Sequence, residues 1–211
     1  MKQVLSLAIV MLTGLGIFIQ SRSAADPGGH SPSVYQLGEQ VADFDLPGVD
    51  GSTHSLADLY GSGAKGIIVI FTCNTCPVSQ RNEERIIELH EKMVNQGYPV
   101  LAINANDPGK SPGDNMEAMI QRAENKDYPF LYVQDKSQET ARAFGAAHTP
   151  QVFLLDGDRR LRYTGAIDDN PYNAGAVNQR YVEEAVERLK VGGTPDPAKT
   201  KSVGCSIKYR S

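Results

Sequence analysis

The sequence predicts an α/β domain in which a central mixed β-sheet is flanked by helices. Gly66–Thr72 is a continuous run of β-branched and aromatic residues, which is typical of a strand buried on both faces. Segments with helical periodicity alternate with strand-like segments after it, as in α/β folds. Further on, Gln151–Leu155 and Leu161–Thr164 flank a turn at Asp156–Arg159 and predict an antiparallel hairpin, which makes the sheet mixed.

The other elements follow from local patterns. Before the central strand, Val41–Leu46 alternates apolar and polar residues and predicts a short strand. The segment after Cys76 repeats apolar residues at helical spacing, with Pro77 in the first turn, where proline is tolerated. The remaining predicted elements are a turn at Gly48–Gly51, a helical turn at Ser55–Leu59, strands at Tyr98–Asn104 and Phe130–Val133, and helices around Met116–Ala123, Gln138–Phe144 and Gln179–Lys190.

Composition and charge narrow the function classes. The 211 residues carry a formal net charge of −4, which argues against nucleic acid as a partner, because phosphate binding favours a basic surface. No glycine-rich phosphate loop or dinucleotide fingerprint is present, so we expect no NAD(P)H, flavin or other cofactor. Asp168–Asn170 is interpreted as a polar loop whose side chains cap its own backbone rather than as a metal site.

The N-terminus has the parts of a secretory signal peptide. Lys2 precedes the uncharged run Val4–Ile19, and Ser23–Ala25 supplies small residues at a cleavage site. An uncleaved membrane anchor is the alternative, although the run is shorter than the roughly 20 residues that span a bilayer. We therefore expect an exported protein of the periplasm or cell envelope. The predicted organisation is a signal peptide over 1–25, a linker over 26–33, the α/β domain over 34–191 and a C-terminal tail over 192–211 that carries Cys205.

Cys73 and Cys76 form a C-x-x-C pair between the buried strand and the following helix. Unpaired N–H groups and the dipole at a helix N-terminus favour a thiolate there. We expect Cys73, normally the more exposed position, to attack a partner's disulfide and Cys76 to resolve the mixed disulfide. An inert structural disulfide is the alternative, while a closed zinc site needs about four ligands and the chain has one C-x-x-C.

Two further features bear on this pair. Thr149-Pro150 directly precedes a predicted strand, and a proline there can be cis and expose the preceding backbone to an extended substrate. Cys205 lies in the tail, predicted to be irregular, and is either a thiol without a task or a third redox cysteine that exchanges with the pair. Among the histidines, His90 is expected at the surface and His148 near the cysteines.

With these motifs the chain resembles the thioredoxin superfamily, and more closely the peroxiredoxin-like redoxin branch of the alkyl hydroperoxide reductase/thiol-specific antioxidant group. The resemblance implies a thioredoxin-like fold with an N-terminal hairpin. It also implies that Cys76 occupies the peroxidatic position of true peroxiredoxins. The stretches that carry the resemblance are Phe71–Pro77 (FTCNTCP), Ala102–Asp107 (AINAND), Ala141–Gly145 (ARAFG), Gly165–Asn170 (GAIDDN) and Gly204–Lys208 (GCSIK).

The sequence departs from the peroxidase pattern P-x-x-x-T-x-x-C. Counting back from Cys76 places Cys73 where the threonine should stand and Val69 where the proline should stand. We therefore expect a thiol-disulfide oxidoreductase acting on protein dithiols and disulfides. Peroxide reduction by Cys76 is one alternative. A non-catalytic scaffold or copper-binding module is another, with His148 beside the two cysteines, but copper carriers of this fold use a longer C-x-x-x-C spacing.

Overall fold

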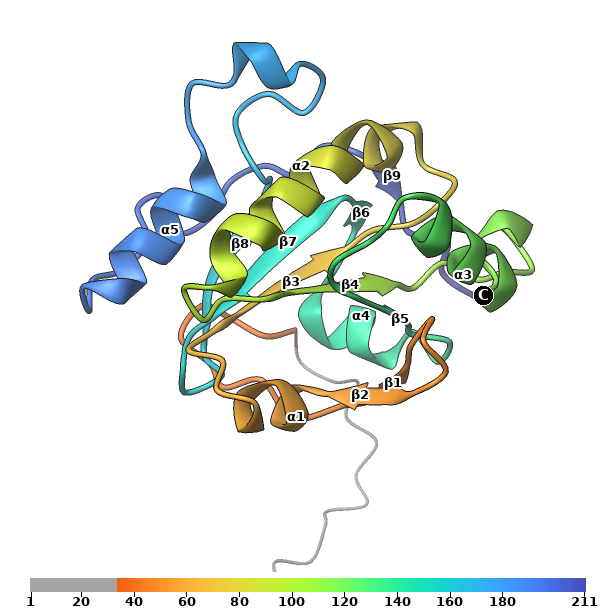
Figure 1. Ribbon diagram of the computed structural model, residues 1–211, viewed down its shortest axis with the longest axis horizontal. Coiled ribbons are helices and arrows are strands. Elements are labelled where there is room, and N and C mark those ends of the chain that lie inside the picture. The colour runs from red at the N-terminus through yellow and green to blue at the C-terminus, as the bar shows by residue number, and fades with distance from the viewer. Residues whose placement is uncertain (1–33) are drawn as a thin grey trace, which may run out of the picture. The chain divides into compact units, whose positions relative to one another are not determined.

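The structure is a computed structural model that describes residues 34–211. Its centre is a five-stranded sheet in the order β5-β4-β3-β7-β8 (Figure 1). β3 pairs in parallel with β4 and antiparallel with β7, so the predicted mixed sheet is confirmed. The strands are β3 (Ile67–Phe71), β4 (Val100–Asn104), β5 (Leu131–Gln134), β7 (Gln151–Leu155) and β8 (Leu161–Gly165).

Helices cover both faces of this sheet (Figure 1). Successive side chains of a strand point to opposite faces of the sheet, so the apolar residues of β3 contribute to two hydrophobic cores. Ile67, Val69 and Phe71 join a cluster with the α1 and α4 side chains, while Ile68 and Ile70 join one with α2 and α5. The helices are α1 (Leu56–Gly61), α2 (Pro77–Val94), α3 (Met116–Asn125), α4 (Glu139–Phe144) and α5 (Tyr181–Lys190), with 3-10 turns η1 (Pro112–Asp114) and η2 (Ala174–Ala176).

The predicted N-terminal hairpin is present, but it begins later than expected. Its strands are β1 (Asp45–Pro47) and β2 (Thr53–Ser55), which pair antiparallel. The start of the predicted strand, at Val41, is instead held by a single backbone hydrogen bond of 2.8 Å to Arg159. The hairpin lies at the bottom of the view in Figure 1, next to α1.

The prediction for His90 is wrong. This side chain on α2 is buried, with 7% exposure, because its Nδ1 accepts the Val100 N–H at 3.1 Å at the start of β4. Burial lowers its pKa, which keeps the ring neutral as an acceptor. The partly polar face of α2 therefore contains one structural histidine that links the helix to the sheet.

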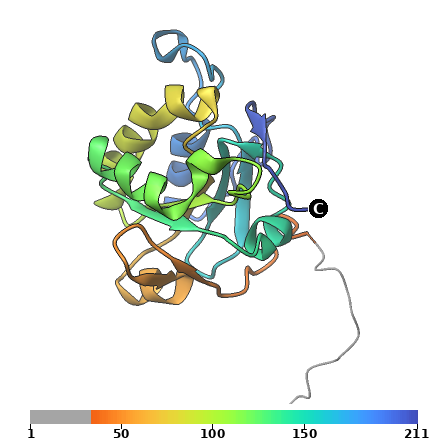
Figure 2. The same cartoon turned by 90° about the vertical axis from the view of Figure 1, so that its right-hand side faces the viewer.

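The tail is more ordered than expected. Residues 205 and 206 form a short strand, β9 (Cys205–Ser206), which pairs antiparallel with β6 (His148–Thr149). Figures 1 and 2 show this segment at the end of the molecule where α2 begins. Upstream, the Thr164 and Thr200 backbones are hydrogen-bonded around a parallel bridge between Thr164 and Lys199. The tail therefore extends along β8 and then reaches the loop before β7.

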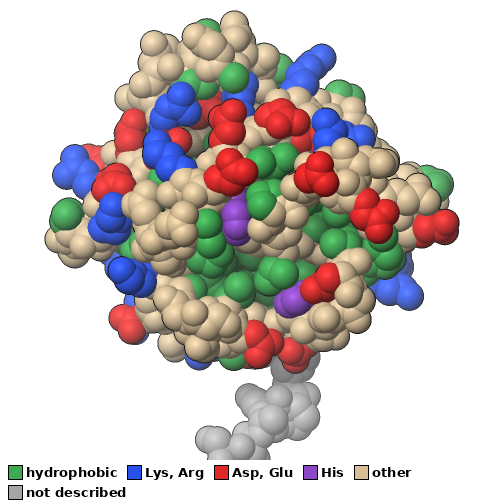
Figure 3. Space-filling view, viewed as in Figure 1, with side chains coloured by type: hydrophobic (Ala, Val, Ile, Leu, Met, Phe, Trp, Pro, Cys, Tyr) green, Lys and Arg blue, Asp and Glu red, His purple; other side chains and the backbone are tan. Residues whose placement is uncertain are grey.

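The predicted signal peptide and linker lie outside the described residues. Within residues 34–211, none of the helices is long and apolar enough to cross a membrane. On the face seen in Figure 3, acidic and basic side chains are interspersed rather than collected into one basic area.

Candidate active site at the N-terminus of helix α2

The cysteine pair lies on the loop that connects β3 to α2. Cys76 is the N-cap residue of α2, and its extended backbone lets the helix begin at Pro77. We expected Cys73 to be the more exposed of the two, but both are buried, with exposures of 3% and 2%. The η1 loop covers one side of the pair and the C-terminal strand covers another, which accounts for the difference.

Thr149 contacts both cysteines. Its hydroxyl oxygen lies 3.2 Å from Cys73 Sγ, and its carbonyl oxygen accepts the Cys76 thiol at 3.1 Å. The Thr149-Pro150 peptide bond is cis. The structure thus brings all four of these residues together, although Cys76 and Pro150 are far apart in the sequence.

Cys205 completes a cluster of three thiols. Its backbone N–H donates to Cys76 Sγ at 3.4 Å. All three cysteines are present as free thiols, and Cys205 is the one that is partly exposed. Cys76 therefore lies between Cys73 on its own loop and Cys205 on the tail.

The three thiols have different pKa values. Hydrogen bonding from Cys73, supported by Cys205 and by the Ser79 N–H in the first turn of α2, holds the pKa of Cys76 well below its ordinary value in spite of burial. The same hydrogen bond to Cys76 raises the pKa of Cys73, as does burial. Hydrogen bonding to Cys76 also raises the pKa of Cys205. These contacts favour Cys76 as the thiolate, whereas we expected Cys73 to be the attacking thiol.

A buried carboxylate, not identified from the sequence, holds the loop between the cysteines. Asp114 in η1 is fully buried, with 0% exposure. It accepts the Asn74 N–H at 2.7 Å and the Thr75 hydroxyl at 2.7 Å. Burial alone would raise its pKa, but the hydrogen bonds it receives outweigh burial and lower the pKa. The other donors to this carboxylate are Ser111 Oγ, Asn104 Nδ2 and Asn106 Nδ2.

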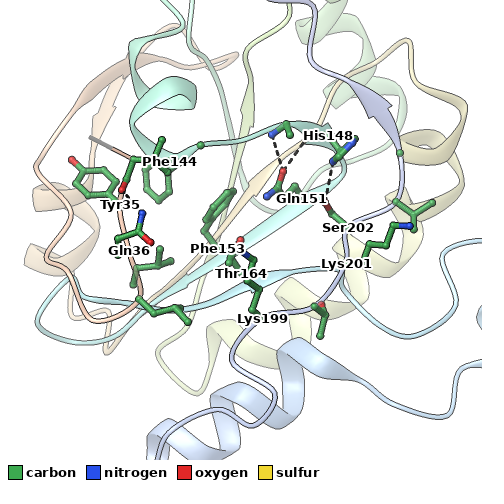
Figure 4. A pocket seen from close by; sticks show the side chains of 18 residues that line it. Tyr35, Gln36, Phe144, His148, Gln151, Phe153, Thr164, Lys199, Lys201 and Ser202 are labelled. Atoms are coloured by element: carbon green, nitrogen blue, oxygen red, sulfur yellow. Dashed lines mark hydrogen bonds between the residues drawn. The ribbon is translucent and has the colours of Figure 1, made fainter. Parts of the chain in front are cut away.

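His148 faces away from the thiols. Its Nδ1 lies 3.2 Å from Ser202 Oγ, and its ring borders a cavity of about 780 Å³ (Figure 4). Figure 4 shows this cavity between the Phe144 and Phe153 side chains and the tail residues that include Lys199. Neither Cys73 nor Cys76 lines it. Within residues 34–211, no group of three or more His, Cys, Asp or Glu side chains is arranged to hold a metal ion.

The interpretation of Asp168–Asn170 as a self-capping polar loop is confirmed. Asp168 Oδ1 accepts the Asn170 N–H at 2.9 Å, and Asp169 Oδ1 accepts the Asn178 N–H at 3.0 Å. Asp168 also forms an ion pair with Arg85 of α2 at 3.0 Å. This loop therefore fastens the 165–180 segment to the helix that carries Cys76.

Comparisons with known proteins agree with this architecture. The family model described as "AhpC/TSA family" matches residues 37–164. The thiol-disulfide oxidoreductase ResA of Halalkalibacterium halodurans is 26% identical over 187 residues, which cover 88% of this chain and 93% of the relative. A relative with the same printed name from Geobacillus thermodenitrificans is 25% identical and covers 73% of this chain and 80% of its own.

Solved structures give the same picture of the fold. An uncharacterized conserved protein from Geobacillus kaustophilus is 35% identical, with a TM-score of 0.76, over 84% of this chain and 94% of its own. A hypothetical protein from Sinorhizobium meliloti is 34% identical, with a TM-score of 0.77, over 83% of this chain and 96% of its own. A more distant likeness, 19% identical with a TM-score of 0.55, is to a putative thiol:disulfide interchange protein DsbE from Chlorobium tepidum. The fold is thioredoxin-like, as expected.

Proposed function

The chain belongs to the AhpC/TSA family within the thioredoxin superfamily, and from that premise we propose that it is a thiol-disulfide oxidoreductase whose redox pair is Cys73 and Cys76. The observation that carries the proposal is the placement of Cys76 Sγ at the N-terminus of α2, where the Cys205 N–H donates to it at 3.4 Å and the Ser79 N–H also faces it. The curated relatives, which are named thiol-disulfide oxidoreductases and align over most of this chain, support an oxidoreductase activity.

The contacts support Cys76 as the reacting sulfur. A thiolate, not a thiol, is the nucleophile in disulfide exchange, and the lowered pKa of Cys76 makes it the thiolate. It attacks one sulfur of a partner's disulfide, which forms a mixed disulfide and releases the partner's other sulfur as a thiolate. Cys73 gives its proton to the released partner thiolate and then attacks Cys76 Sγ. The Cys73–Cys76 bond forms, the partner leaves reduced, and the same steps in reverse oxidise a partner dithiol.

Thr149 positions this exchange. Its hydroxyl lies 3.2 Å from Cys73 Sγ, so it can donate to the Cys73 thiolate that forms when the pair is attacked from outside. The Asp114 carboxylate keeps the Asn74-Thr75 backbone in place between the two cysteines. Protein dithiols and disulfides are the proposed partners, and no cofactor is needed for this chemistry.

Insulin reduction with dithiothreitol tests the proposal. The wild type is expected to accelerate insulin precipitation and C76S to lose the acceleration. The double variant C73S/C205S, which lacks both neighbouring thiols, is expected to accumulate mixed disulfides without turnover. Gly61→Ala, at the exposed end of α1 where an added Cβ meets no other atom, serves as a matched handling control. Wild-type protein that does not exceed dithiothreitol alone would remove the enzyme proposal in favour of a scaffold.

Peroxide reduction is a second candidate, favoured by one observation. Cys76 stands at the position that carries the peroxidatic cysteine in this family, and its pKa is lowered. Against it, the hydroxyl of Thr149 contacts Cys73 and not Cys76. Stopped-flow oxidation of reduced protein by hydrogen peroxide separates the two candidates, because a rate near that of free cysteine excludes a peroxidase.

We propose that the protein acts outside the cytosol, in the periplasm or cell envelope. The support is the N-terminal segment, where Lys2, the uncharged run Val4–Ile19 and Ser23–Ala25 have the order of a secretory signal. Fractionation of cells that express the full chain, with N-terminal sequencing of the product, tests both export and cleavage after Ala25.

The copper-binding alternative has weak support, since the His148 ring nitrogen Nδ1 pairs with Ser202.

A further inference from the structure

The C-terminal strand occupies the edge of the site at which a partner's chain would pair. Thr149 stands opposite Cys205, and His148 stands opposite Ser206, in an antiparallel pairing. The Ile207 N–H extends this contact by donating to the Ala147 carbonyl at 3.0 Å. Extended peptides bind exposed strand edges in this manner, with the backbone supplying hydrogen bonds and alternate side chains supplying specificity. Here the strand belongs to the same chain.

The pairing is close enough to require glycine next to Cys205. A Cβ atom built on Gly204 would collide with the Thr149 carbonyl group, which is the group that accepts the Cys76 thiol. Gly204 thus allows the tail backbone to approach the one residue that contacts both cysteines of the pair. The neighbouring Cys205 backbone then donates to Cys76 Sγ at 3.4 Å.

The tail is fastened on the C-terminal side of Cys205. Ile207 is buried, with 5% exposure, and packs into the cluster below the sheet. The Lys208 N–H donates to Asn106 Oδ1 at 2.8 Å, and the Tyr209 hydroxyl donates to the Ala146 carbonyl at 2.7 Å. Arg142 lies over the Tyr209 ring at 4.5 Å. These contacts hold Cys205 beside Cys76 rather than leaving it on a free end.

We propose that residues 203–207 act as an internal partner strand and that Cys205 forms a disulfide with Cys76 in exchange with the Cys73–Cys76 disulfide. The proposal rests on the proposed redox function of the pair. In the exchange, the Cys205 thiolate attacks Cys76 Sγ, the Cys76–Cys205 bond forms and the Cys73–Cys76 bond breaks. Cys73 leaves as a thiolate and takes up a proton. The step consumes no oxidant, because one disulfide replaces another.

This exchange gives the buried pair a route to the surface. Cys73 and Cys76 are 3% and 2% exposed, whereas Cys205 is partly exposed. In the Cys76–Cys205 form, an outside thiol can reach the Cys205 sulfur without displacing the tail. Cys205 therefore serves as the sulfur through which electrons enter or leave the pair.

Disulfide mapping of the full chain tests the proposal. C73S is oxidised with diamide, quenched with acid and alkylated, and its peptides are identified by mass spectrometry. We expect an intramolecular Cys76–Cys205 link in C73S, and both this link and Cys73–Cys76 in partly oxidised wild type. Recovery of alkylated Cys205 alone, or of intermolecular links alone, would overturn the proposal.

Two variants in the C73S background show whether strand pairing creates the link. Gly204→Val places a side chain against the Thr149 carbonyl and is expected to lower the yield of the Cys76–Cys205 link about tenfold, which corresponds to about 1.4 kcal/mol. Lys201→Val, an exposed position of the same tail, is expected to leave the yield unchanged. Equal yields in both variants would contradict the role of the pairing.

A third variant separates this proposal from the function on which it rests. C205S retains Cys73 and Cys76, so it is expected to close the Cys73–Cys76 disulfide on oxidation. If C205S closes that disulfide while C73S forms no Cys76–Cys205 link, the pair is redox-active and the internal partner strand is refuted. If C205S does not close it, the proposed function itself fails, whatever C73S forms.

Discussion

Replacing Asp114 by asparagine tests whether one buried carboxylate organises the cysteine loop. Asp114 is 0% exposed and accepts hydrogen bonds from five side-chain or backbone donors. The amide of D114N keeps one oxygen acceptor but turns a donor toward groups that are themselves donors. A hydrogen bond to a charged group contributes about 1.5–3 kcal/mol and a neutral one about 0.5–1.5 kcal/mol. Because the amide also avoids burying a charge, we expect a net loss of about 2–4 kcal/mol in the free energy of unfolding.

Urea denaturation as a function of pH measures this loss of stability and shows how the contribution of Asp114 changes with pH. The pKa of Asp114 is lowered by folding, so its contribution is complete above the unfolded value of about 3.9 and disappears as pH falls through the folded value. Wild type should therefore lose stability below about pH 4 more steeply than D114N. Asp45→Asn, at an exposed carboxylate outside the site, should change little. Equal stability of D114N and wild type at neutral pH would refute the reasoning.

Two other predictions concern helix α2 and the thiols. Glu83 is buried in a bidentate pair with Arg122 of α3, with both N–O distances at 2.7 Å, so E83Q should lower the free energy of unfolding in urea by about 2–3 kcal/mol. Glu84→Gln, on the exposed side of α2, should not lower it. Similar losses in both variants would argue against a stabilising role of the pair. The thiolate absorbance of the reduced protein should persist at pH values well below the ordinary cysteine pKa. Cys73→Ala should shift this titration of Cys76 to higher pH, because the main hydrogen-bond donor to Cys76 is lost. An unshifted titration would contradict the assignment of the thiolate to Cys76.

Most of the fold could be predicted from the sequence because local patterns and tertiary packing agree. The apolar run of β3 is long, and the helical period of α2 continues over the whole helix, so neither element depends on distant contacts for its identity. The antiparallel pairing of β7 with β8 follows from the predicted hairpin, whereas the strand order of the sheet was not predicted. In these segments, propensity, periodicity and burial all favour the same structure.

The parts that could not be predicted depend on contacts between distant residues. His90 is buried because its ring accepts a backbone N–H from β4, and a histidine on a polar helix face carries no sign of that contact. Asp114 lies in a Ser-Pro-Gly-Asp turn that has the composition of a surface loop, while four of its five donors come from two other parts of the chain, the cysteine loop and the end of β4. β9 spans only two residues and has no periodicity, so the sequence predicted the possible exchange of Cys205 with the pair but not the strand that places it there.

The arrangement of the thiols also predicts that the Cys73–Cys76 disulfide is comparatively easy to reduce. Groups that stabilise a thiolate in the reduced form make the corresponding disulfide easier to reduce. Cys76 receives hydrogen bonds from Cys73, from Cys205 and from the first turn of α2, all of which favour its thiolate. The Cys73–Cys76 disulfide should therefore be easier to reduce than a structural disulfide, for which potentials lie below about −300 mV. Equilibration of C205S with glutathione buffers measures the pair alone, since Cys205 can no longer compete. A potential below about −300 mV would mean that these contacts do not favour the reduced form, and the assignment of the thiolate to Cys76 would fail with it.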